Sequence, residues 1–402
     1  MKVKMAKDLK ILYVSAALIA PPHTGCMIRT MNIARKLKNC GQVTLLAVAG
    51  ELNEDSVKLA REEFDNVHLL NLKDYSEYGN KTGRLIKKFH MHWPWSSGRQ
   101  ANDEGQKLFL ELVARHDIVW FHTLGAAFPF RFKKLPNSVM DLDDLNHCKY
   151  ALRSGQDKTL RLQMSARVQS IKWKRHEFEA LKQYDKTIVC SQIDKELLGS
   201  GDNIHVVPNG FTRPETEPQW QEPDKLRLGF IGTLAYGPNR DGLIWFRDHV
   251  WPLIRKQKPN ITLRIVGSPP PKEDVIEAEG FESLGYVDDP TGEFQTWSAM
   301  VVPLLFGGGT RIKIIESFSK MCAVVSTTPG AHGILATHEK DILLTDDPEK
   351  FAEYCLQLSN SPEKGKQMAE AGWQLFVKKY SWDVIGKSIK AIIEETRLTE
   401  CH

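Results

Sequence analysis

The sequence lacks the long apolar runs of membrane-spanning proteins and the paired cysteines of secreted or zinc-binding ones. No apolar stretch approaches the roughly 20 residues that cross a bilayer. The seven cysteines are odd in number and form no C-x-x-C pair, which argues against a disulfide framework and a zinc site and fits a reducing compartment. The basic start, Met1 to Lys10, leads directly into an expected strand instead of a signal-peptide core. We therefore expect a cytoplasmic protein.

Strong net charge and a dinucleotide fingerprint are also missing. A formal charge of +4 over 402 residues is too small to indicate nucleic-acid binding by itself. No G-x-G-x-x-G follows the first expected strand, which makes an NAD-dependent dehydrogenase a weak hypothesis. There is no tandem repeat or low-complexity tract. Because single cores stop growing at roughly 250–300 residues, the length predicts two domains.

Apolar runs of strand length alternate with amphipathic segments of helix length, which indicates parallel sheets with helices on both faces. The expected strands are Lys10–Val14, Val43–Ala49, Val67–Asn71, Ile118–His122, Val139–Leu142, Thr187–Cys190, His205–Val207, Leu228–Ile231, Thr262–Val266, Ser283–Val287, Met300–Phe306 and Ala323–Ser326. The main expected helices are Arg29–Lys38, Thr159–Gln183 and Asp241–Arg255.

The domain boundaries follow from a change in composition. A stretch rich in Pro, Glu and Thr without periodicity predicts a linker at residues 212–225. It separates an N-terminal domain, residues 1–211, from a C-terminal domain, residues 226–380, and a final helical segment follows at 381–402. Ligands of such sheets bind beyond the carboxyl ends of the strands, so we expect the substrate in a cleft between the domains.

The most informative segment, Ser298 to Phe318, reads SAMVVPLLFGGGTRIKIIESF. An expected buried strand breaks at three glycines, and a helical pattern follows. Amides of a glycine turn and the positive end of a helix form an anion-binding nest. Arg311 and Lys313 add positive charge, and Glu316 is placed to accept hydrogen bonds from a sugar hydroxyl. A nucleoside diphosphate would use all three features. The alternative is a plain strand-to-helix turn with a solvated Arg and Lys, and with Glu316 paired to Lys313 or Lys320.

With these features established, the chain resembles the GT-B glycosyltransferases of family 4 from about Leu12 to Trp382. The blocks that carry the resemblance are PPHTGCMIR (Pro21–Arg29), RHEFEALKQYD (Arg175–Asp185), VCS (Val189–Ser191), VVPNG (Val206–Gly210), GFIG (Gly229–Gly232) and YSW (Tyr380–Trp382). YGPNRD at Tyr236–Asp241, with WF at 245–246 and VWPLI at 250–254, is similar to a bacterial subgroup associated with exopolysaccharide and lipid-linked sugar assembly. The resemblance implies an α/β fold of the GT-B type, with two doubly wound Rossmann-like domains facing a central cleft. It also implies that the final helix crosses back onto the first domain.

The resemblance assigns the nucleotide-sugar donor, a UDP- or GDP-sugar, to the second domain, without a metal or another cofactor. The donor-binding candidates are Gly232, Thr233, Asn239, Tyr286, Val287, Gly307, Gly308, Gly309 and Thr310. The catalytic candidates are His122, Arg311, Lys313 and Glu316. Two positions depart from the family. Gly308 stands eight residues before Glu316, where a second Glu is common, and Thr233 replaces an Arg, with no Lys before Arg240. We therefore expect Arg311 and Lys313 to carry the diphosphate charge.

The first domain supplies the acceptor-side candidates Gly25, Arg29, Asp141, Asp143 and Asp144. Gly25 would let the backbone approach the phosphates, or is a simple turn glycine. Arg29 is either a phosphate or acceptor contact or a solvated helix residue. His122 ends an apolar strand, where the resemblance implies a sugar-contacting histidine and a backbone-bonded one is the alternative. The three aspartates suit acceptor hydroxyls or general-base catalysis, with helix capping or a metal as alternatives.

A basic and aromatic segment suggests a membrane-facing surface. Lys81 to Arg99 contains Phe89, Trp93 and Trp95 among five cations, without an acid. Cations beside tryptophans suit an anionic bilayer, and Lys172–Arg175 adds a second basic stretch. The alternative is a solvated loop and helix face. Nucleic acid is disfavoured by the modest net charge.

Together these features predict a retaining, metal-independent glycosyltransferase that moves a sugar from a nucleotide-sugar donor to a glycan or lipid-linked acceptor. We expect it to be cytoplasmic, and peripheral at the inner membrane face if the basic segment binds lipid. Two alternatives stay open. One is a nucleotide-sugar 2-epimerase, and the other is a non-catalytic subunit that binds a nucleotide sugar on the same fold.

Overall fold

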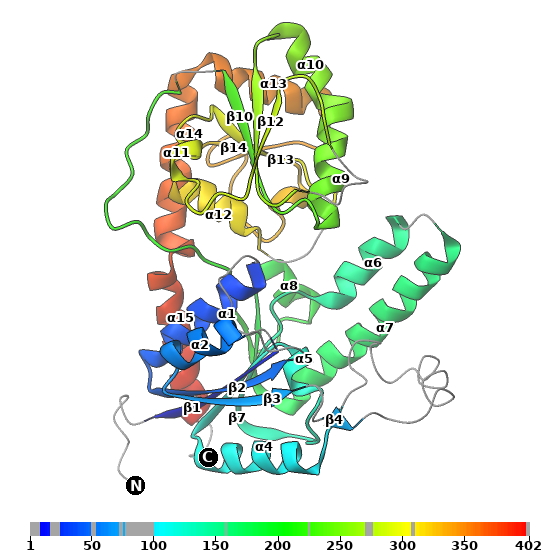
Figure 1. The fold of residues 1–402 in the computed structure, drawn as a ribbon, viewed down its shortest axis with the longest axis vertical. Helices are drawn as coiled ribbons and strands as arrows, with labels where there is room; N and C mark the ends of the chain where they lie inside the picture. Colours follow the sequence, from blue (N-terminus) through cyan, green and yellow to red (C-terminus); the bar gives the residue numbers. More distant parts are fainter. Residues whose placement is uncertain are drawn as a thin grey trace. The chain divides into compact units, whose positions relative to one another are not determined.

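The chain forms two compact units, each built around its own parallel sheet (Figure 1). The computed structural model describes residues 9–16, 25–49, 54–71, 75–76, 100–156, 159–223, 226–269, 276–306 and 310–398. Unit 1 comprises residues 1–208 and 385–402, and unit 2 comprises residues 209–384. Among the helices in these ranges, none has the length and apolar character needed to cross a bilayer.

The sheet of unit 1 has seven parallel strands in the order β3-β2-β1-β6-β7-β8-β9. Their bounds are β1 Lys10–Ser15, β2 Gln42–Ala49, β3 Asn66–Asn71, β6 Ile118–His122, β7 Leu135–Asp141, β8 Tyr184–Val189 and β9 Ile204–Val206. Tyr75–Ser76 (β4) and Gln100–Ala101 (β5) form a separate antiparallel pair. Because the strand order reverses between β1 and β6, the carboxyl ends of these two strands mark the topological switch point.

The sheet of unit 2 has six parallel strands in the order β12-β11-β10-β13-β14-β15. Their bounds are β10 Arg227–Ile231, β11 Thr262–Val266, β12 Phe281–Gly285, β13 Ala299–Val302, β14 Val324–Ser326 and β15 Leu343–Leu344. Its switch point lies between β10 and β13. Both sheets are therefore doubly wound, as the alternating sequence pattern predicts.

Helices connect the strands and cover both faces of each sheet (Figure 1). In unit 1 they are α1 Gly25–Lys38, α2 Glu54–Glu63, α4 Asp103–Arg115, α5 Leu124–Ala127, α6 Asn146–Gln156, α7 Leu160–Gln183 and α8 Gln192–Leu197. In unit 2 they are α9 Gly237–Trp245, α10 Trp251–Gln257, α11 Thr291–Phe294, α12 Ile312–Ser319, α13 Pro348–Asn360 and α14 Pro362–Leu375. π-Helical turns at Phe246–Val250 and Phe376–Tyr380 follow α9 and α14, a 3₁₀ turn occupies Pro329–Ala331, and α15 spans Trp382–Leu398.

The central strand β13 shows why these runs are buried on both sides. Ala299 and Val301 pack into the core under α9, α10 and α13, whereas Met300 and Val302 pack into the core under α12 and α14. All four residues are fully buried. A strand whose two faces both meet helices reads as a continuous apolar run, which is the pattern that the sequence displays.

Several elements differ in their bounds from the sequence-based expectations, such as α1, which begins at Gly25, and β12, which ends at Gly285. Two of the differences have a clear physical reason. The strand expected at Met300–Phe306 ends at Val302, because Pro303 follows and proline has no amide for the sheet. The helix expected at Asp241–Arg255 begins earlier, at Gly237, with Pro238 in its first turn, where proline is favoured.

The chain passes from unit 1 to unit 2 and back through segments that pair with each other. The Phe211 amide donates to the Tyr380 carbonyl at 3.0 Å, and the Trp382 amide donates to the Phe211 carbonyl at 3.3 Å. Residues 209–223, which include part of the expected linker, belong to unit 2, where Trp373 Nε1 donates to Glu217 at 3.1 Å. From Ile385 onward, α15 belongs to unit 1.

Candidate functional site

The charged candidates of unit 2 lie on α12, which follows β13 at the switch point of the sheet. Gly307–Gly309, the expected nest, lie outside the described residues, so their role stays a prediction. The structure resumes at Thr310, which is buried, and α12 begins at Ile312. Its apolar residues Ile314, Ile315 and Phe318 are fully buried, and this packing fixes the direction in which the polar face of the helix points.

Lys313 contacts two residues from the other side of the switch point. Its Nζ donates a hydrogen bond of 2.8 Å to Asn239 Oδ1 and lies 4.5 Å from the centre of the Phe230 ring. The Asn239 amide is fixed in turn, because its Nδ2 donates to the Thr233 carbonyl at 2.9 Å. The chain β10–loop–α9 therefore holds the ammonium group in one place by a hydrogen bond and a cation–π contact.

Gly232 is the residue that makes room for this contact. Its φ is +154°, and a Cβ at this position would lie 2.7 Å from Asn239 Nδ2 and 2.8 Å from Lys313 Nζ. Any larger side chain would therefore displace the amide or the ammonium. The glycine after the first strand of unit 2 is required by this close approach of side chains.

Burial shifts the pKa values of two side chains on α12 toward neutrality. Together with the nearby Arg311 charge, and against the opposing effect of Glu316, it lowers the pKa of Lys313 to about 7. It raises the pKa of Glu316 to about 7, against the opposing effect of Lys320 and Lys313. Burial disfavours the charged form of each group, so both titrate near neutral pH and respond to a ligand that brings charge or hydrogen bonds. Such groups cluster at functional sites.

The direct hydrogen bonds of these residues go to other partners, although the charges of Lys320 and Lys313 still act on Glu316. Arg311 is buried and donates to the Pro329 carbonyl at 3.5 Å, so it is not a solvated helix residue. Lys320 donates to Thr291 Oγ1 at 2.7 Å, and Lys313 is bonded to Asn239. Within the described part of the chain, the Glu316 carboxylate accepts no hydrogen bond and forms no ion pair. The carboxylate is half-buried, and no direct polar contact to the described residues holds it in place.

Tyr286 and Val287 follow β12 at the same carboxyl edge of the sheet. Tyr286 is exposed, whereas Val287 packs against the core that α12 covers. Gly285, with φ +69°, turns the chain between the strand and these residues. The structure thus brings Gly232, Asn239 and Lys313 into contact, and it places Thr233, Tyr286 and Val287 on the loops that leave the same edge.

In unit 1, Arg29 is fully buried in an ion pair, so the expectation of a solvated helix residue is wrong. Its guanidinium donates to both carboxylate oxygens of Asp141, at 2.9 and 3.1 Å, and to the Val207 carbonyl at 3.0 Å. Asp141 is fully buried as well. Bidentate pairs of this kind are among the strongest polar contacts in proteins. Arg29 and Asp141 therefore join α1, β7 and the segment after β9. Each side chain has the other as its ionic partner.

The two neighbouring aspartates have different partners. Asp143, at φ +56°, accepts a hydrogen bond of 3.2 Å from Cys190 Sγ. The Arg29 guanidinium, at 3.6 Å, keeps the pKa of Asp143 below its usual value despite burial. Asp144 lies 3.6 Å from Lys149 Nζ and is partly exposed. Of the three aspartates, Asp144 is the most accessible to an acceptor. No group of three or more His, Cys, Asp or Glu among the described residues is arranged to hold a metal ion.

His122 ends β6 at the switch point of unit 1, as the sequence predicts. Its Nδ1 lies 3.1 Å from Thr30 Oγ1, and its buried Nε2 has no hydrogen-bond partner among the described residues. Burial lowers the pKa of His122, so the ring is neutral at pH 7. The Nδ1 contact is with a hydroxyl, and the sugar-contacting role of His122 stays a prediction. Gly25 is the first residue of α1, and the loop before it, residues 17–24, is outside the described ranges.

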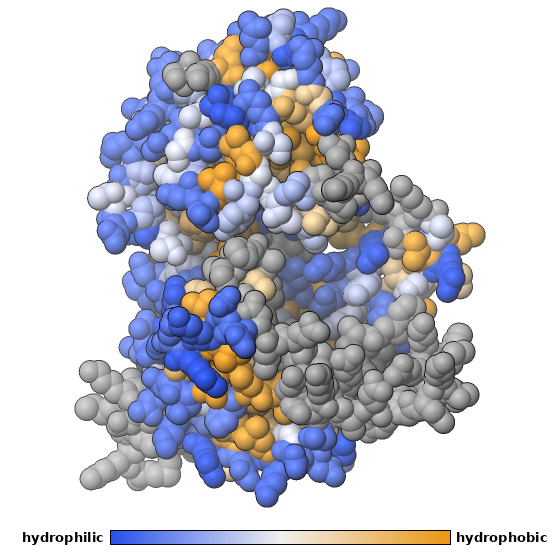
Figure 2. Space-filling model, viewed as in Figure 1, coloured by the Kyte–Doolittle hydropathy of each residue, from blue (hydrophilic) through white to orange (hydrophobic). Residues whose placement is uncertain are grey.

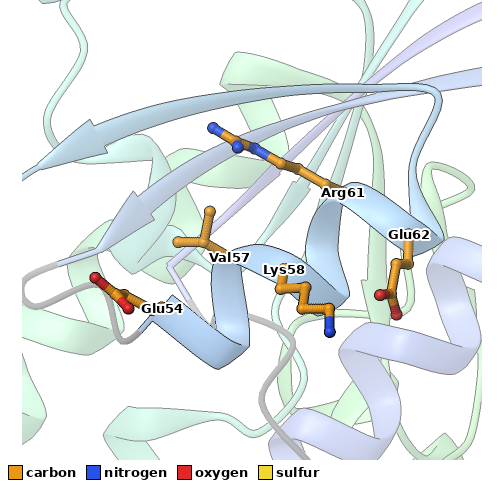
Figure 3. Close-up of a pocket in the computed structure, with 5 residues that line it drawn as sticks. All are labelled: Glu54, Val57, Lys58, Arg61 and Glu62. Carbon is orange, nitrogen blue, oxygen red and sulfur yellow. The ribbon is translucent and has the colours of Figure 1, made fainter.

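Two surface hollows of the described residues lie away from these candidates. One, of about 400 Å³, is lined by side chains of α2 alone, Glu54, Val57, Lys58, Arg61 and Glu62 (Figure 3). Another, of about 500 Å³, lies between the segment after α5 and helix α7. Because a row of charged side chains on one helix converges on no common point, we assign the α2 hollow no role.

Sequence reasoning missed the supporting residues Phe230, Thr30 and Cys190. Phe230 reads as an ordinary core residue of a strand, and only its contact with Lys313, on a distant segment, reveals it. Thr30 follows Arg29 directly, and Cys190 is the middle residue of the VCS block. Their positions were visible in the sequence, but their partners were not.

Part of this sequence is similar to known proteins. Residues 225–361 match the family model described as glycosyl transferases group 1. A 44.6 kDa protein from the cps region of Klebsiella pneumoniae is 25% identical over 224 residues, which cover 51% of this chain. The chain spans 58% of the length of that relative.

Solved structures share the fold at low sequence identity. HepE from Anabaena, in complex with UDP and glucose, superimposes with a TM-score of 0.62 at 14% identity and covers 96% of this chain and 100% of its own. A variant of Staphylococcus aureus TarM, in complex with fondaparinux, α-GlcNAc-glycerol and UDP, gives 0.67 at 12% identity, over 96% and 99%. WaaG, a glycosyltransferase involved in lipopolysaccharide biosynthesis, gives 0.61 at 13%, also over 96% and 99%. The expected fold is thereby confirmed. Residues 225–361 match an enzyme family, the group 1 glycosyl transferases, within a chain that has the two-sheet α/β fold of GT-B glycosyltransferases.

Proposed function

We propose that the protein is a glycosyltransferase that moves a sugar from a nucleotide-sugar donor to a glycan or lipid-linked acceptor. The observation that carries the proposal is the α12 site in the region that matches the family. Lys313 is fixed against Asn239 and Phe230, and Glu316 has a carboxylate that the fold leaves unused. The structures of HepE with UDP-glucose and of the TarM variant with UDP support a UDP-sugar as the first donor to test.

The proposed chemistry depends on stabilising the leaving nucleoside diphosphate. Negative charge builds on the phosphate oxygens as the bond to the sugar C1 breaks, so fixed cations help the transition state more than the ground state. Lys313 and Arg311 supply this charge, and the amides of Gly308 and Gly309 stay a prediction beside them. Because these cations come from the chain itself, we propose a metal-independent reaction. Glu316 accepts hydrogen bonds from the ribose hydroxyls.

We further propose that the reaction retains the configuration at C1. In a front-side transfer, the acceptor oxygen bonds to C1 on the face that the diphosphate leaves, and the acceptor proton goes to a diphosphate oxygen. Such a step needs no nucleophile from the protein. Neutral His122 and partly exposed Asp144 are the first-unit candidates for contacts with the sugar and the acceptor.

The acceptor class rests on the similarity to the exopolysaccharide subgroup and on the Klebsiella relative from the cps region. We propose a glycan or lipid-linked acceptor, and a protein that works at the inner face of the membrane. The basic and aromatic segment Lys81–Arg99, the first basis of this idea, lies outside the described residues.

The test is sugar transfer from UDP-, GDP- and ADP-sugars to extracted lipid-linked glycans, with product analysis by mass spectrometry. Wild type should transfer one of these sugars, and the rate should survive EDTA. Lys313→Ala should lose on the order of 10²–10³ in rate, the usual cost of one such donor. Glu316→Ala should weaken donor binding by about 10- to 100-fold, the loss of charge-assisted hydrogen bonds.

Two results would contradict the proposal. Conversion of the nucleotide sugar without an acceptor would indicate a 2-epimerase. Tight donor binding with no turnover on any acceptor would indicate a binding subunit. Lys366→Ala on the exposed face of α14 is the matched control, because it removes a cation of the same unit outside the site.

A further inference from the structure

Helices α6 and α7 form an antiparallel pair that extends away from the sheet of unit 1 (Figure 1). Thr159 caps α7, since its hydroxyl accepts a hydrogen bond from the Leu162 amide at 3.3 Å. One face of α7 packs inward with buried Ala166, Trp173 and Ala180. That face therefore supplies the apolar contacts that pack α7 against the rest of unit 1.

The opposite face of α7 is also apolar, although it faces solvent. Leu160, Met164, Val168 and Ile171 follow one another at spacings of four, four and three residues, so they form a single stripe along the helix. Their exposed fractions are 77%, 65%, 36% and 60%. Hydrophobic residues scattered singly on a surface need no explanation, but a continuous stripe marks an interaction site.

Cations border this stripe and acids are missing from it. Arg161 and Arg167 lie beside it on α7, and Lys174 continues the same face. From Asn146 to Arg175 the sequence has eight Lys or Arg and one acid, Asp157. Figure 2 shows hydrophobic residues next to strongly hydrophilic ones at the free end of the α6–α7 pair. An apolar stripe with cationic borders is the pattern of a helix that lies at the surface of an anionic bilayer.

We propose that this outer face of α7 docks unit 1 onto an anionic lipid surface. Leu160, Met164 and Ile171 enter the headgroup boundary, and Arg161 and Arg167 pair with lipid phosphates. A lipid surface fits better than a protein partner because its negative charge complements the cations along the border of the stripe. The proposal concerns a different surface from the donor site and does not depend on transfer activity.

The experiment measures binding of the full chain to vesicles by flotation. Vesicles of phosphatidylcholine with 30% phosphatidylglycerol, taken as a roughly physiological anionic content, should bind wild type, whereas pure phosphatidylcholine should bind it weakly. Arg161→Gln with Arg167→Gln should lower the partition coefficient about 25-fold, because each cation near such a surface contributes roughly fivefold. Met164→Ser with Ile171→Ser should lower it by about tenfold or more through lost apolar contact.

Matched substitutions on α4 of the same unit serve as the control. Leu110 is 51% exposed, and Lys107 is an exposed cation on that helix. Leu110→Ser with Lys107→Gln should leave binding unchanged, and circular dichroism should show that all variants are folded. The proposal would be overturned if wild type failed to bind anionic vesicles at low salt. It would also be overturned if the α7 variants bound as well as wild type. A wild-type dimer that the Met164 and Ile171 substitutions dissociate would also overturn it, since the stripe would then be an interface between copies.

Discussion

At the scale of single residues, α12 keeps two ionisable groups in unfavourable surroundings. Lys313 and Glu316 both have pKa values of about 7, shifted in opposite directions by burial. Burying such groups lowers the stability of the free protein, and selection for stability alone would replace them. Their presence therefore points to a role in binding. Ligand binding should then change both stability and protonation, and each change can be measured separately.

Glu316→Gln should stabilise the free protein at neutral pH. In the wild type, folding raises the pKa of this carboxyl from its ordinary value of 4.5 to about 7. Between these values the carboxyl ionises in the unfolded state first, so stability falls as the pH rises. Glutamine does not ionise. The difference in unfolding midpoint between variant and wild type should therefore grow from pH 4 to pH 7 and level off above it, as measured by thermal unfolding across this range. A difference that is constant with pH would contradict the assigned pKa.

Lys313 should take up a proton when a nucleoside diphosphate binds at pH 8. Its pKa of about 7 leaves it mostly neutral there, and the adjacent anion raises the pKa. Calorimetric titration with UDP in two buffers of different ionisation enthalpy should give an uptake close to one proton per site. In Lys313→Met the two buffers should give the same enthalpy. Glu316 does not contribute at this pH, because it is already ionised and hydrogen bonds from ribose keep it so.

The sequence allowed Lys313 and Glu316 to be chosen because both lie in the first two helical turns after a glycine-rich segment. It did not reveal that Lys313 bonds to Asn239, which is 74 residues away. For the same reason, neither interpretation of Arg29, a phosphate or acceptor contact or a solvated helix residue, included its ion pair. Its partner Asp141 lies 112 residues further along the chain, and no local pattern encodes a contact at that distance.

At the scale of elements, one ion pair joins three segments of unit 1. Arg29 on α1 binds Asp141 at the end of β7 and the Val207 carbonyl after β9. Both side chains are fully buried. The pair therefore sets how α1 approaches the carboxyl edge of the sheet, where His122 and Asp144 also lie.

Asp141→Asn should lower the free energy of unfolding of unit 1 by about 3–5 kcal/mol, because it leaves a buried guanidinium without its counter-charge. Arg29→Met combined with Asp141→Leu should recover a large part of this loss, since two apolar groups of similar size need no pairing. Urea unfolding of wild type, Arg29→Met, Asp141→Leu and the double variant gives the coupling energy. Glu370→Gln, which removes an exposed partner of Lys366, is the control and should leave the transition unchanged. Losses that simply add would contradict the coupling.

Elements were predicted best where burial leaves no choice. Ile118–His122 and Thr262–Val266 have the expected bounds. The first strand is buried at every position, and Leu263, Ile265 and Val266 of the second are buried. The π-helical turn at Phe246–Val250 was not predicted. Hydrophobic spacing alone does not distinguish one extra residue in a turn from a regular helix.

At the scale of the whole chain, unit 1 is assembled from two separate parts of the sequence. Ile385, Ile389, Ile392 and Ile393 of α15 are at most 3% exposed, and α15 is tied to β8 by an ion pair of 3.0 Å between Lys186 and Glu395. The expected domain boundaries and the cleft between the domains stay predictions. The two-domain α/β fold itself could be predicted, since its signal is repeated along the chain.

Ending the chain after Val384 should destabilise unit 1 and spare unit 2. Each buried isoleucine contributes roughly 1.5–3 kcal/mol, so the loss of four is comparable to the whole stability of a domain, about 5–15 kcal/mol. Hydrogen exchange with mass spectrometry should show lost protection in β1 and β6 and retained protection in β10 and β13. Equal loss in both sheets would show that the units do not unfold separately.

The divided make-up of unit 1 also sets an order of events during synthesis. Domains generally fold as units while the ribosome is still adding residues, the first domain before the second. Here residues 209–384 are a single uninterrupted stretch, whereas residues 1–208 wait for α15. The half of the molecule that is translated later is therefore the first to be complete, and nascent residues 1–208 stay uncovered on the side that α15 will occupy.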